Sequence, residues 1–543
     1  MYCLNCRNGA FCSLLSLPQG PQCYSGKTPP DWNAQDRKKL MVKRSRADWL
    51  RAGDKNSKFF HMKASARQKK NTIRELIDEN GMSQTDAKGI NRTVCKYFSS
   101  VFTSNNPSDL ASNFIECKMN SDMLTDLNAP FEDFEVKQAL FNLGSTKAPR
   151  PDGFCAIFFQ KNWDVVGGYI TNVCLRVLNG SLSIKDFNST NVALIPKIKN
   201  PLRMNEFRPI SLCSVVYKTV TKAIANRLKP LLPNLISSSQ SAFVPGRLIF
   251  DNVLIAFEML HSINKRKKGK RGFAALKLDM SMAYNCVKWR FLKKVLEKLG
   301  FPNKFIALIW DCISTSSFSF VVNGNVVGKV FPSKGLRQGY PLSPYLFLFC
   351  VEAFFAMIHG KAQREGPLGF RCCRGNPPVS HLFFADDSVL FCRVSKANGA
   401  AIKRILKIYE EGFGQQINFL KSSVSYSLNV NTQARLSFQN MLGLSGSSSY
   451  DKYLGLPTLI GRNKKHIFNA IKERVWKRLK SWKGSFFSMG GKEVLIKAID
   501  QAVPTYTMSL FQIPSSLCKD LTSLISGFWW GFNGDKRKMS WAS

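Results

Sequence analysis

Alternating apolar and polar positions predict several strands along the chain. The clearest signal is a hairpin over residues 318–330, where two β-branched, alternating runs flank Asn323-Gly324, a pair that suits a type I′ turn. An apolar run over residues 191–197 predicts a more deeply buried strand. Residues 382–391 contain two apolar runs around an Asp pair, as if two strands met in a tight turn. Short strands joined by tight turns are therefore expected.

Helical periodicity predicts helices over residues 217–232, over 283–299 and beyond Gly461. The apolar face of the last segment consists of Ile467, Ile471, Val475, Leu479 and Trp482. The longest apolar stretch, residues 345–358, contains Glu352 and is too short to span a bilayer. It is expected to be a buried helix, so no membrane is predicted as a partner. Residues 131–190 have the pattern of mixed α/β structure.

Composition excludes a largely disordered chain, because hydrophobic residues make up 44% and aromatic residues 12% of the 543 residues. The formal net charge of +42 predicts a polyanionic partner, most often nucleic acid and less often an anionic membrane surface. The 16 cysteines are scattered through apolar segments and no secretory signal precedes them. They predict buried free thiols in an intracellular protein.

Three segments concentrate the positive charge. Residues 36–70 contain thirteen Lys and Arg against three Asp, which fits either a solvated helical connector or an arm that grips phosphates. Residues 265–271 carry six basic residues in seven and predict a loop before a strand. Residues 461–484 contain nine basic residues and one acidic residue. Together they predict a surface that binds nucleic-acid backbone.

Residues 1–35 are rich in Cys, Gly, Pro and Ser and lack periodicity, so an irregular tail is expected. Cys3 and Cys6 form a CxxC pair, and Cys12 and Cys23 follow. A zinc site is the less favoured alternative, because the spacing is irregular and no His lies nearby. Elsewhere the five His are scattered, which gives no support to a hydrolase triad.

Two carboxylate sites stand out in this acid-poor chain. Asp279 ends an apolar run, and Asp386 with Asp387 lies between two apolar runs. Adjacent like charges between apolar strands are costly unless a cation neutralises them, and carboxylate oxygens suit Mg²⁺. An Asp-Asp pair alone is often only a turn. It carries more weight here because Gly335-Leu336-Arg337-Gln338-Gly339, whose glycines allow close approach of a base or template strand, lies between the two sites.

These residues, taken in order, resemble the reverse transcriptase of non-LTR, LINE-type retrotransposons, particularly those of plants. The resemblance covers roughly residues 40–543. Its motifs are 194–197 (LIPK), 207–212 (FRPISL), 240–247 (QSAFVPGR), Asp279 with Tyr284, 336–344 (LRQGYPLSP), 384–387 (FADD), 417–422 (INFLKS) and 452–457 (KYLGLP). Eight collinear motifs make a chance match negligible.

The resemblance implies an α+β, right-hand polymerase fold with fingers, a palm containing an antiparallel sheet, and a helical thumb. The expected divisions are a tail over 1–35, a basic helical connector over 36–130 and fingers over 131–275, with the palm starting near residue 272. The palm would cover 276–440. Primer grip and thumb, with the start of a truncated C-terminal region, would cover 441–543.

The family's residue roles transfer only to matching positions. Asp279, Asp386 and Asp387 would be catalytic and hold two Mg²⁺ ions, or Mn²⁺. Lys197 and Arg208 would bind the incoming triphosphate, and Lys421 would be a candidate general acid for pyrophosphate or simply a solvated lysine. Tyr284 would exclude a ribose 2′-OH, unless it only packs a helix. The nucleotide and template pocket would include Gln338 and Gly339, and the primer grip would begin at Tyr453, Leu454 and Gly455.

Four positions depart from the family pattern. Arg150 replaces a Gly in a Pro-rich loop, Met282 a Lys, Asn285 an Asp, and Tyr340 an Asp that follows Gln-Gly. The Tyr340 ring is expected to add bulk beside the pocket. No endonuclease domain is recognisable in residues 1–130, and the chain ends where a Cys/His-rich region would open. A partial or decaying copy is therefore expected.

The leading functional prediction is an RNA-directed DNA polymerase that uses an RNA template, a DNA primer or target and deoxynucleoside triphosphates. Its site of action would be the nucleus. One alternative is a catalytically inactive retrotransposon remnant that retains RNA and DNA binding. Another is an RNA-templated RNA polymerase, which the aromatic residue at Tyr284 and the LINE-like fingers motifs disfavour.

Overall fold

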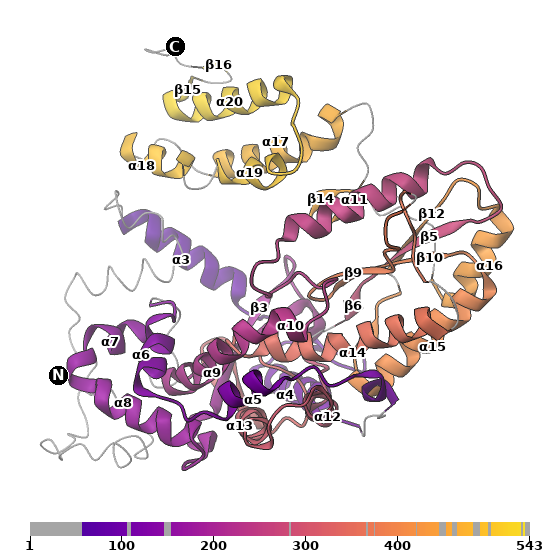
Figure 1. The fold of residues 1–543 in the computed structure, drawn as a ribbon. Coiled ribbons are helices and arrows are strands. Elements are labelled where there is room, and N and C mark those ends of the chain that lie inside the picture. Colours follow the sequence, from indigo (N-terminus) through magenta and orange to yellow (C-terminus); the bar gives the residue numbers. More distant parts are fainter. Residues whose placement is uncertain are drawn as a thin grey trace, which may run out of the picture. The chain divides into compact units, whose positions relative to one another are not determined.

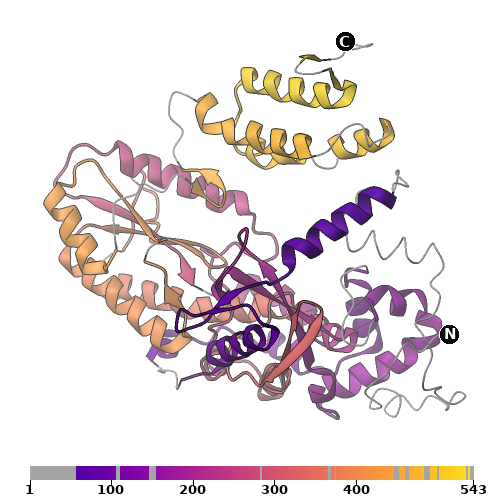
Figure 2. The same ribbon diagram turned by 180° about the vertical axis from the view of Figure 1, so that it is seen from behind.

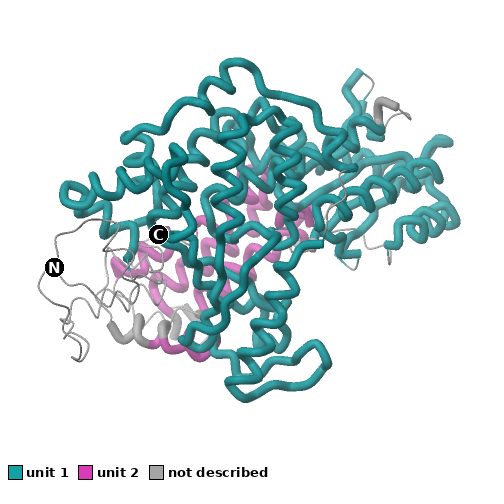
Figure 3. The backbone as a smooth tube through the Cα atoms, turned by 90° about the horizontal axis from the view of Figure 1, so that it is seen from below, with its two compact units in different colours: residues 1–23, 71–450 teal, residues 24–70, 451–543 magenta. Residues whose placement is uncertain are grey.

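The computed structural model divides the chain into two compact units, formed by residues 1–23 with 71–450 and by residues 24–70 with 451–543 (Figure 3). Each unit is described by itself. The structure describes residues 57–105, 110–145, 154–281, 284–364, 368–373, 375–419, 421–444, 452–458, 464–481, 489–497, 501–533 and 536–537. The predicted tail, the first part of the basic arm, Arg150, Met282 and Trp482 lie outside these ranges.

The first unit mixes helices and strands and is α+β in class (Figure 1). Its helices are α4 (Ala87–Phe102), α5 (Ser121–Asn128), α6 (Asp133–Phe141), α7 (Ala156–Lys161), α8 (Trp163–Leu178), α9 (Val215–Leu228), α10 (Leu232–Leu235), α11 (Ile249–Lys265), α12 (Trp289–Leu299), α13 (Asn303–Ser314), α14 (Ser343–Arg364), α15 (Lys396–Phe413) and α16 (Thr432–Leu442). Its strands are β1 (Leu76–Ile77), β2 (Ser83–Gln84), β3 (Ser189–Pro196), β4 (Phe207–Cys213), β5 (Phe273–Leu278), β6 (Met280–Ser281), β7 (Ser317–Val322), β8 (Asn325–Val330), β9 (His381–Phe384), β10 (Asp387–Arg393), β11 (Gln416–Ile417) and β12 (Ser423–Tyr426).

One four-stranded sheet, here called the aspartate sheet, has the order β12-β5-β10-β9 and is antiparallel throughout. The two inner strands, β5 and β10, are largely apolar on both faces, because helices cover both: α11 lies on one side and α14 with α15 on the other (Figure 1). Leu276, Phe391 and Val424 are nearly inaccessible to solvent. Continuous apolar runs in the sequence are the mark of such doubly covered strands.

The second four-stranded sheet, here called the mixed sheet, has the order β4-β3-β7-β8. β3 pairs antiparallel with β4 and parallel with β7, and β7 forms the predicted hairpin with β8 (Figure 2). β7 alternates between buried and half-buried residues, as expected of a sheet with one face toward a core. Two rings of α4 cover that face: Phe98 stacks on Phe320, and Phe102 meets Phe318 edge-on.

The predicted apolar helix at 345–358 is confirmed as the middle of α14. By length and composition, residues 343–361 could cross a membrane, but 67% of that window is buried inside the fold. Glu352 shows why a charge is tolerated there: its carboxylate accepts hydrogen bonds from Lys118 Nζ at 2.6 Å and from the Ser237 amide at 3.0 Å. A buried carboxylate requires such partners.

The second unit is mainly helical. Its described elements are α3 (Ser57–Asn71), β13 (Lys452–Tyr453), β14 (Leu456–Pro457), α17 (Lys464–Ser481), α18 (Met489–Leu495), α19 (Ala502–Met508), α20 (Ser515–Trp530), β15 (Phe532–Asn533) and β16 (Lys536–Arg537). Ile471, Val475 and Leu479 form the buried face of α17, as the periodicity predicts. They pack with Leu517 and Leu521 of α20.

Two local predictions are wrong. The described part of residues 131–190 contains only helical elements apart from its last two residues, which begin β3, because Ile170, Val173 and Val177 lie on the buried face of a helix, α8. The helix expected from residue 283 begins only at Trp289; residues 284–286 form a turn before it, and Lys288 forms an isolated bridge with Lys334. The loop predicted at 265–271 is confirmed between the end of α11 and the start of β5.

Candidate active site

The Asp pair lies at the tight turn between β9 and β10. Phe384 pairs with Asp387, so the loop consists of Ala385 and Asp386 alone. Ala385 has φ +55, a left-handed conformation that a residue with a Cβ adopts only under constraint. The predicted geometry is confirmed in this respect: Asp386 occupies the tip and Asp387 begins β10.

Strand register brings Asp279 to the same end of the aspartate sheet. Ser388 of β10 pairs with Leu278, the last residue of β5, so Asp279 directly after β5 and Asp387 at the start of β10 are the next residues along the two chains. The backbone of Asp279 is fixed on both sides, since its amide donates to Ser422 Oγ at 3.1 Å and its carbonyl accepts from the Asn418 amide at 2.8 Å. One strand pair thus brings together the backbones of aspartates that lie 107 residues apart in sequence (386 − 279).

The electrostatic environment links the three carboxylates. Surrounding protein removes part of the hydration of Asp386, although its side chain still reaches solvent, and this together with the charge of Asp279 raises its pKa. The pKa of Asp387 is raised by burial, by Asp386 and by Asp279, against a lowering effect of Lys277. The negative charge of Asp279 thus makes ionisation of both Asp386 and Asp387 harder, and Asp386 adds to this effect at Asp387, which is the condition that a cation would relieve.

The donor set fits a hard divalent cation, since it offers only carboxylate oxygens and carries unrelieved negative charge. In the described part of the chain, however, no three His, Cys, Asp or Glu side chains are gathered closely enough to form a metal site as they stand. The strand register fixes backbone positions, not the directions of side chains that repel one another. Joint coordination of ions by Asp279, Asp386 and Asp387 therefore stays a prediction.

Tyr284 lies beside the carboxylates. Its ring stacks on Phe347 of α14 with centroids 5.0 Å apart, and its carbonyl accepts the Leu336 amide at 2.6 Å. Burial, together with the negative charge of Asp386, raises its pKa to about 12. The phenol therefore stays neutral at physiological pH and is close enough to Asp386 to sense its charge.

Three cations from separate elements lie near one another. Lys197 follows β3 and donates from Nζ to the Asn205 carbonyl at 2.7 Å. Partial burial, then the positive charges of Arg208 and Lys421, lower its pKa. The backbone of Lys421 is linked to that of Asp279, because the Lys421 amide donates to the Asn418 carbonyl and the Asn418 amide donates to the Asp279 carbonyl. Mutual repulsion among exposed cations favours an anionic ligand.

The Gln338-Gly339 loop is held against β4 by a bond from the Ser211 amide to the Gln338 carbonyl at 3.3 Å. Gly339 has φ +98, and a Cβ built there would meet nothing within 4 Å. Glycine is therefore needed for the backbone conformation, and open space remains in front of it.

Arg337 anchors the same loop from inside the protein, a role that sequence reasoning missed. Its buried guanidinium lies 4.3 Å from the ring centroids of both Tyr217 and Tyr340. Its two terminal nitrogens donate to neutral oxygens only, those of Asn188, Thr190, Tyr217, Cys312 and Tyr340. A cation without a carboxylate partner is costly to bury, and full hydrogen bonding with two aromatic faces offsets that cost.

The expectation that Tyr340 adds bulk beside the pocket is wrong. Its side chain is only 5% exposed, and its hydroxyl bonds Thr190 at 2.9 Å and Arg337. Burial holds its pKa well above the ordinary value, against the charge of Arg337, so the phenol remains neutral. The inward direction of the Tyr340 side chain depends on the contacts inside the loop, and a motif in the sequence does not contain that information. Nothing in the structure explains Asn285.

In the second unit, Tyr453 and Leu456 pair across a two-residue turn of Leu454 and Gly455. Leu454 has φ +49, and its carbonyl accepts a hydrogen bond from the Tyr506 hydroxyl at 3.1 Å. Tyr453 is buried. The predicted primer-grip residues therefore form a β-hairpin whose turn is held by α19.

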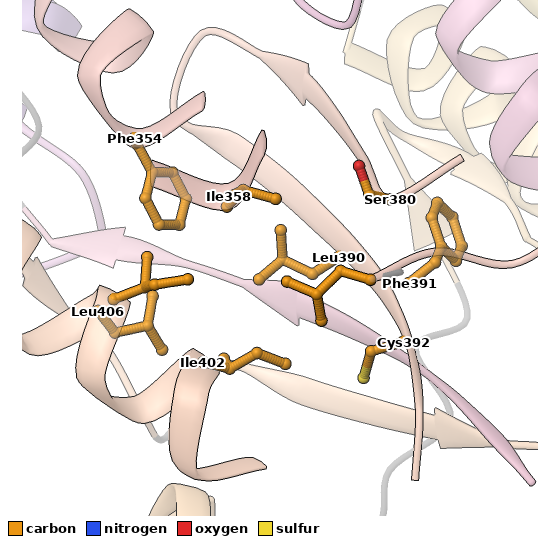
Figure 4. Close-up of a pocket in the computed structure, with 10 residues that line it drawn as sticks. Phe354, Ile358, Ser380, Leu390, Phe391, Cys392, Ile402 and Leu406 are labelled. Carbon is orange, nitrogen blue, oxygen red and sulfur yellow. The ribbon is translucent and has the colours of Figure 1, made fainter. Parts of the chain in front are cut away.

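A small apolar cavity of about 10 Å³ lies under the aspartate sheet, between β10, α14 and α15 (Figure 4). Phe354, Ile358, Leu390, Ile402 and Leu406 point into it from these elements (Figure 4). A cavity of this size holds at most one water molecule, so it is too small for a substrate. The candidate active site is the open end of the sheet instead.

Comparison with known proteins gives this site a context. Residues 195–458 match the family model described as reverse transcriptase (RNA-dependent DNA polymerase). This range contains all the proposed catalytic and substrate-binding residues, from Lys197 to Lys421, and the Tyr453 hairpin.

Three curated relatives extend the comparison. The chain is 28% identical to the uncharacterized 149 kDa protein of transposon TX1 from Xenopus laevis over 84% of the chain and 34% of that protein. It is 49% identical to an uncharacterized mitochondrial protein of Arabidopsis thaliana over 13% of the chain and 57% of that protein. It is 24% identical to the Pol polyprotein of a type-1 retrotransposable element R2 from Nasonia vitripennis over 51% of the chain and 25% of that protein. The chain thus spans about a third of the TX1 protein.

Proposed function

Residues 195–458 belong to the reverse transcriptase (RNA-dependent DNA polymerase) family, and from this premise we propose that the chain extends a DNA 3′-hydroxyl on an RNA template. Retrotransposon relatives support the resemblance to non-LTR, LINE-type elements. One observation carries the proposal: Asp279 and the Asp386-Asp387 pair lie at one sheet end, where the charge of Asp279 raises the pKa of both paired aspartates, with Lys421 tied to the same backbone through Asn418. This arrangement suits an anionic substrate that carries its own cations.

The chain's residues divide the work as follows. Asp279, Asp386 and Asp387 would hold two divalent cations, Mg²⁺ or Mn²⁺, which would activate the 3′-hydroxyl and neutralise phosphoryl charge. Lys197 and Arg208 bind the triphosphate of the deoxynucleotide. Lys421 donates a proton to the departing pyrophosphate.

We also propose which parts of the chain form the fingers, palm and thumb of a right-hand polymerase. The aspartate sheet belongs to the palm, whose range also contains β7 and β8. The fingers comprise β3 and β4 with the helices from α6 to α11, and α17 to α20 form the thumb. The Tyr453 hairpin is the primer grip. The basic loop at 265–271 and the basic face of α17 contact nucleic-acid backbone. A nuclear site of action follows from a DNA target.

Primer extension with purified protein tests this function. A DNA oligonucleotide annealed to a homopolymer RNA should be extended by the complementary deoxynucleotide when Mg²⁺ is present. Asp386→Ala should abolish extension while Asp126→Ala, which changes an exposed aspartate on α5, should not. Extension that survives Asp386→Ala would assign the activity to a contaminant or to another site.

A second function, binding without catalysis, follows from the net charge of +42 and from the departures at Met282 and Asn285. Such a remnant would bind an RNA–DNA duplex with a slope of log K against log salt of about −0.7 to −0.9 per phosphate contacted. It would show no extension with either metal. Normal binding with no extension, including after Asn285→Asp, would favour this alternative.

Tyr284 separates DNA synthesis from RNA synthesis. Its position beside Asp386 supports a contact with the sugar of the incoming nucleotide. Tyr284→Ala should raise ribonucleotide incorporation relative to deoxynucleotide incorporation, and Tyr284→Phe should not. An unchanged ratio in an active enzyme would leave Tyr284 as a packing partner of Phe347.

A further inference from the structure

β9 is an edge strand of the aspartate sheet, and its outer edge is covered by residues 239–242, here called the Gln240 segment. Gln240 forms a parallel bridge with Phe383. The Phe383 amide donates to the Ser239 carbonyl at 2.9 Å, and the Ser241 amide donates to the Phe383 carbonyl at 3.2 Å. The segment thus continues the sheet by one short, parallel pairing.

At Ala385 the pairing continues through a side chain. The Ala385 amide donates to Gln240 Oε1 at 3.0 Å, and the same oxygen accepts the Ala242 amide at 3.0 Å. Because both donors are main-chain N–H groups, the orientation of the Gln240 amide is settled by its contacts. The side-chain oxygen takes the place that a main-chain carbonyl would hold if the strand went on.

The Gln240 segment is itself rigidly held. The Arg247 guanidinium donates to the carbonyls of Gln240 at 2.7 Å, Ile236 at 2.8 Å and Pro233 at 3.1 Å, and also to that of Ser237. Asn252 Nδ2 donates to the Phe383 carbonyl at 2.6 Å. A loop and a helix are therefore tied to the strand that carries the Asp pair.

Gln240 is 1% exposed, and its Nε2 has no hydrogen-bond partner in the described part of the chain. Buried polar atoms without partners are rare and need an explanation. Here the amide is retained for its oxygen, Oε1, which accepts the amide of Ala385, the strained residue immediately before Asp386. Ala385 retains its left-handed conformation only if surrounding structure imposes it.

We propose that Gln240 is a positioning residue for the catalytic turn: its side-chain oxygen fixes Ala385, and through Ala385 it sets the placement of Asp386 and Asp387. This inference rests on the proposed function for its catalytic meaning. Its structural part, control of the turn by a distant amide, is independent of whether this chain polymerises DNA.

The first test measures the turn without activity. Gln240→Met keeps the volume and removes the acceptor, so hydrogen exchange of the Ala385 amide in the full-length protein should speed up at least about tenfold. Gln439→Met is the matched control, because Gln439 is also a buried glutamine with an unpartnered Nε2 in the described structure, on α16. It should leave exchange at residue 385 unchanged.

Gln240→Glu keeps an acceptor and should retain slow exchange, which separates loss of the hydrogen bond from a general disturbance of the fold. This variant also decides the matter if Gln240→Met does not fold. Exchange at Ala385 that is equally slow in Gln240→Met, or equally fast in Gln240→Glu and Gln240→Met, would overturn the proposal.

The second test is rescue. Glycine adopts φ +55 without strain, so Ala385→Gly should restore primer extension to Gln240→Met. We expect Gln240→Met to lower kcat about tenfold or more with little change in KM for the deoxynucleotide, and the double variant to recover most of that loss. A kcat that falls but is not rescued would make Gln240 merely structural. If no protein extends a primer, the proposed function fails while the exchange result stands.

Discussion

The β7–β8 and β9–β10 hairpins of the first unit both have two-residue turns, but different interactions stabilise the two turns. The turn between β7 and β8 consists of Asn323 and Gly324 with φ +51 and +95, which these two residue types adopt readily. The turn between β9 and β10 consists of Ala385 and Asp386, and Ala385 has φ +55 without being a residue that favours it. The first is specified locally, and the second is held by Gln240 from 145 residues away.

The difference indicates where function lies. At the Asn323 turn, local preference and structure agree, and the Asn323 side chain adds a structural link by bonding the amide and carbonyl of Ile73, each at 2.8 Å. At the Ala385 turn, a strained residue persists next to the proposed catalytic carboxylates. The Leu454 turn repeats this pattern, with a non-glycine residue at positive φ and a distant hydroxyl on its carbonyl. Strain held by tertiary contacts is typical of functional sites.

The largest expected difference between the two turns is in catalysis. Asp386→Asn should reduce primer extension by about a thousandfold or more, because no other residue supplies that carboxylate. Asn323→Ala, the corresponding change at the other turn, should lower thermal stability but keep the specific activity of folded protein. Extension rates and melting curves measured on both variants check this. Equal losses of activity would show that the two turns do not differ in role.

A loop held from a distance should also be sensitive at its anchor. Tyr340→Phe removes one acceptor of the buried Arg337 guanidinium, so the unfolding free energy should fall by about 1–3 kcal/mol. Urea denaturation measures this change. Tyr345→Phe, on the first turn of α14, is the control and should change it by less than about 0.5 kcal/mol. A fully stable Tyr340→Phe protein would mean that Arg337 finds its partners elsewhere.

The locally specified turn can be strained on purpose. Gly324 has φ +95 and open space around it, so Gly324→Ala should cost about 1 kcal/mol through backbone conformation alone. Ala385→Gly should have the opposite sign by a similar amount. Calorimetric melting of the two variants tests the pair. The same sign in both would contradict the assignment of strain to Ala385.

The smallest effect concerns charge at the Ala385 turn. The pKa of Asp387 is raised in the folded protein, so the folded state binds its proton more tightly than the unfolded state does. Stability from this group is fully present below the unfolded pKa and is lost as pH rises through the raised folded value. Asp387→Asn should therefore raise the melting temperature at pH 7 by about 1–2 °C, and the gain should vanish near pH 3. A lower melting temperature for Asp387→Asn at pH 7 would contradict this prediction, because it would mean that the ionised Asp387 stabilises the folded state.

How far sequence predicts this molecule can be seen in the same elements. Local patterns predict the Asn323 hairpin, the helix of α17 and the strands that carry Asp279 and Asp387, because each depends on periodicity or turn chemistry over a few residues. The meeting of Asp279 with the Asp pair follows from the resemblance to a polymerase family. What holds the turns does not follow from either, because Gln240 and Arg337 act through contacts between segments far apart in the chain.

Tyr340 shows the limit most clearly. As a departure from a motif it suggests damage at a pocket. Its side chain is nevertheless directed inward, where its hydroxyl and ring contact the buried Arg337 guanidinium. The role of a loop residue depends on the direction in which its side chain points. Here Gly339, with φ +98, turns the chain immediately before Tyr340. Periodicity carries no information about such a position.

The parallel pairing of β3 with β7 also has a consequence for folding during synthesis on the ribosome. Ser189 pairs with Ser317, so 317 − 189 = 128 residues must be synthesised before the pairing can begin. At roughly 5–20 residues per second a ribosome needs about 6–25 s for that stretch. During this interval the inner edge of β3 has no partner on the nascent chain. Translation speed and chaperone access over these seconds therefore influence how much of the protein reaches its native sheet.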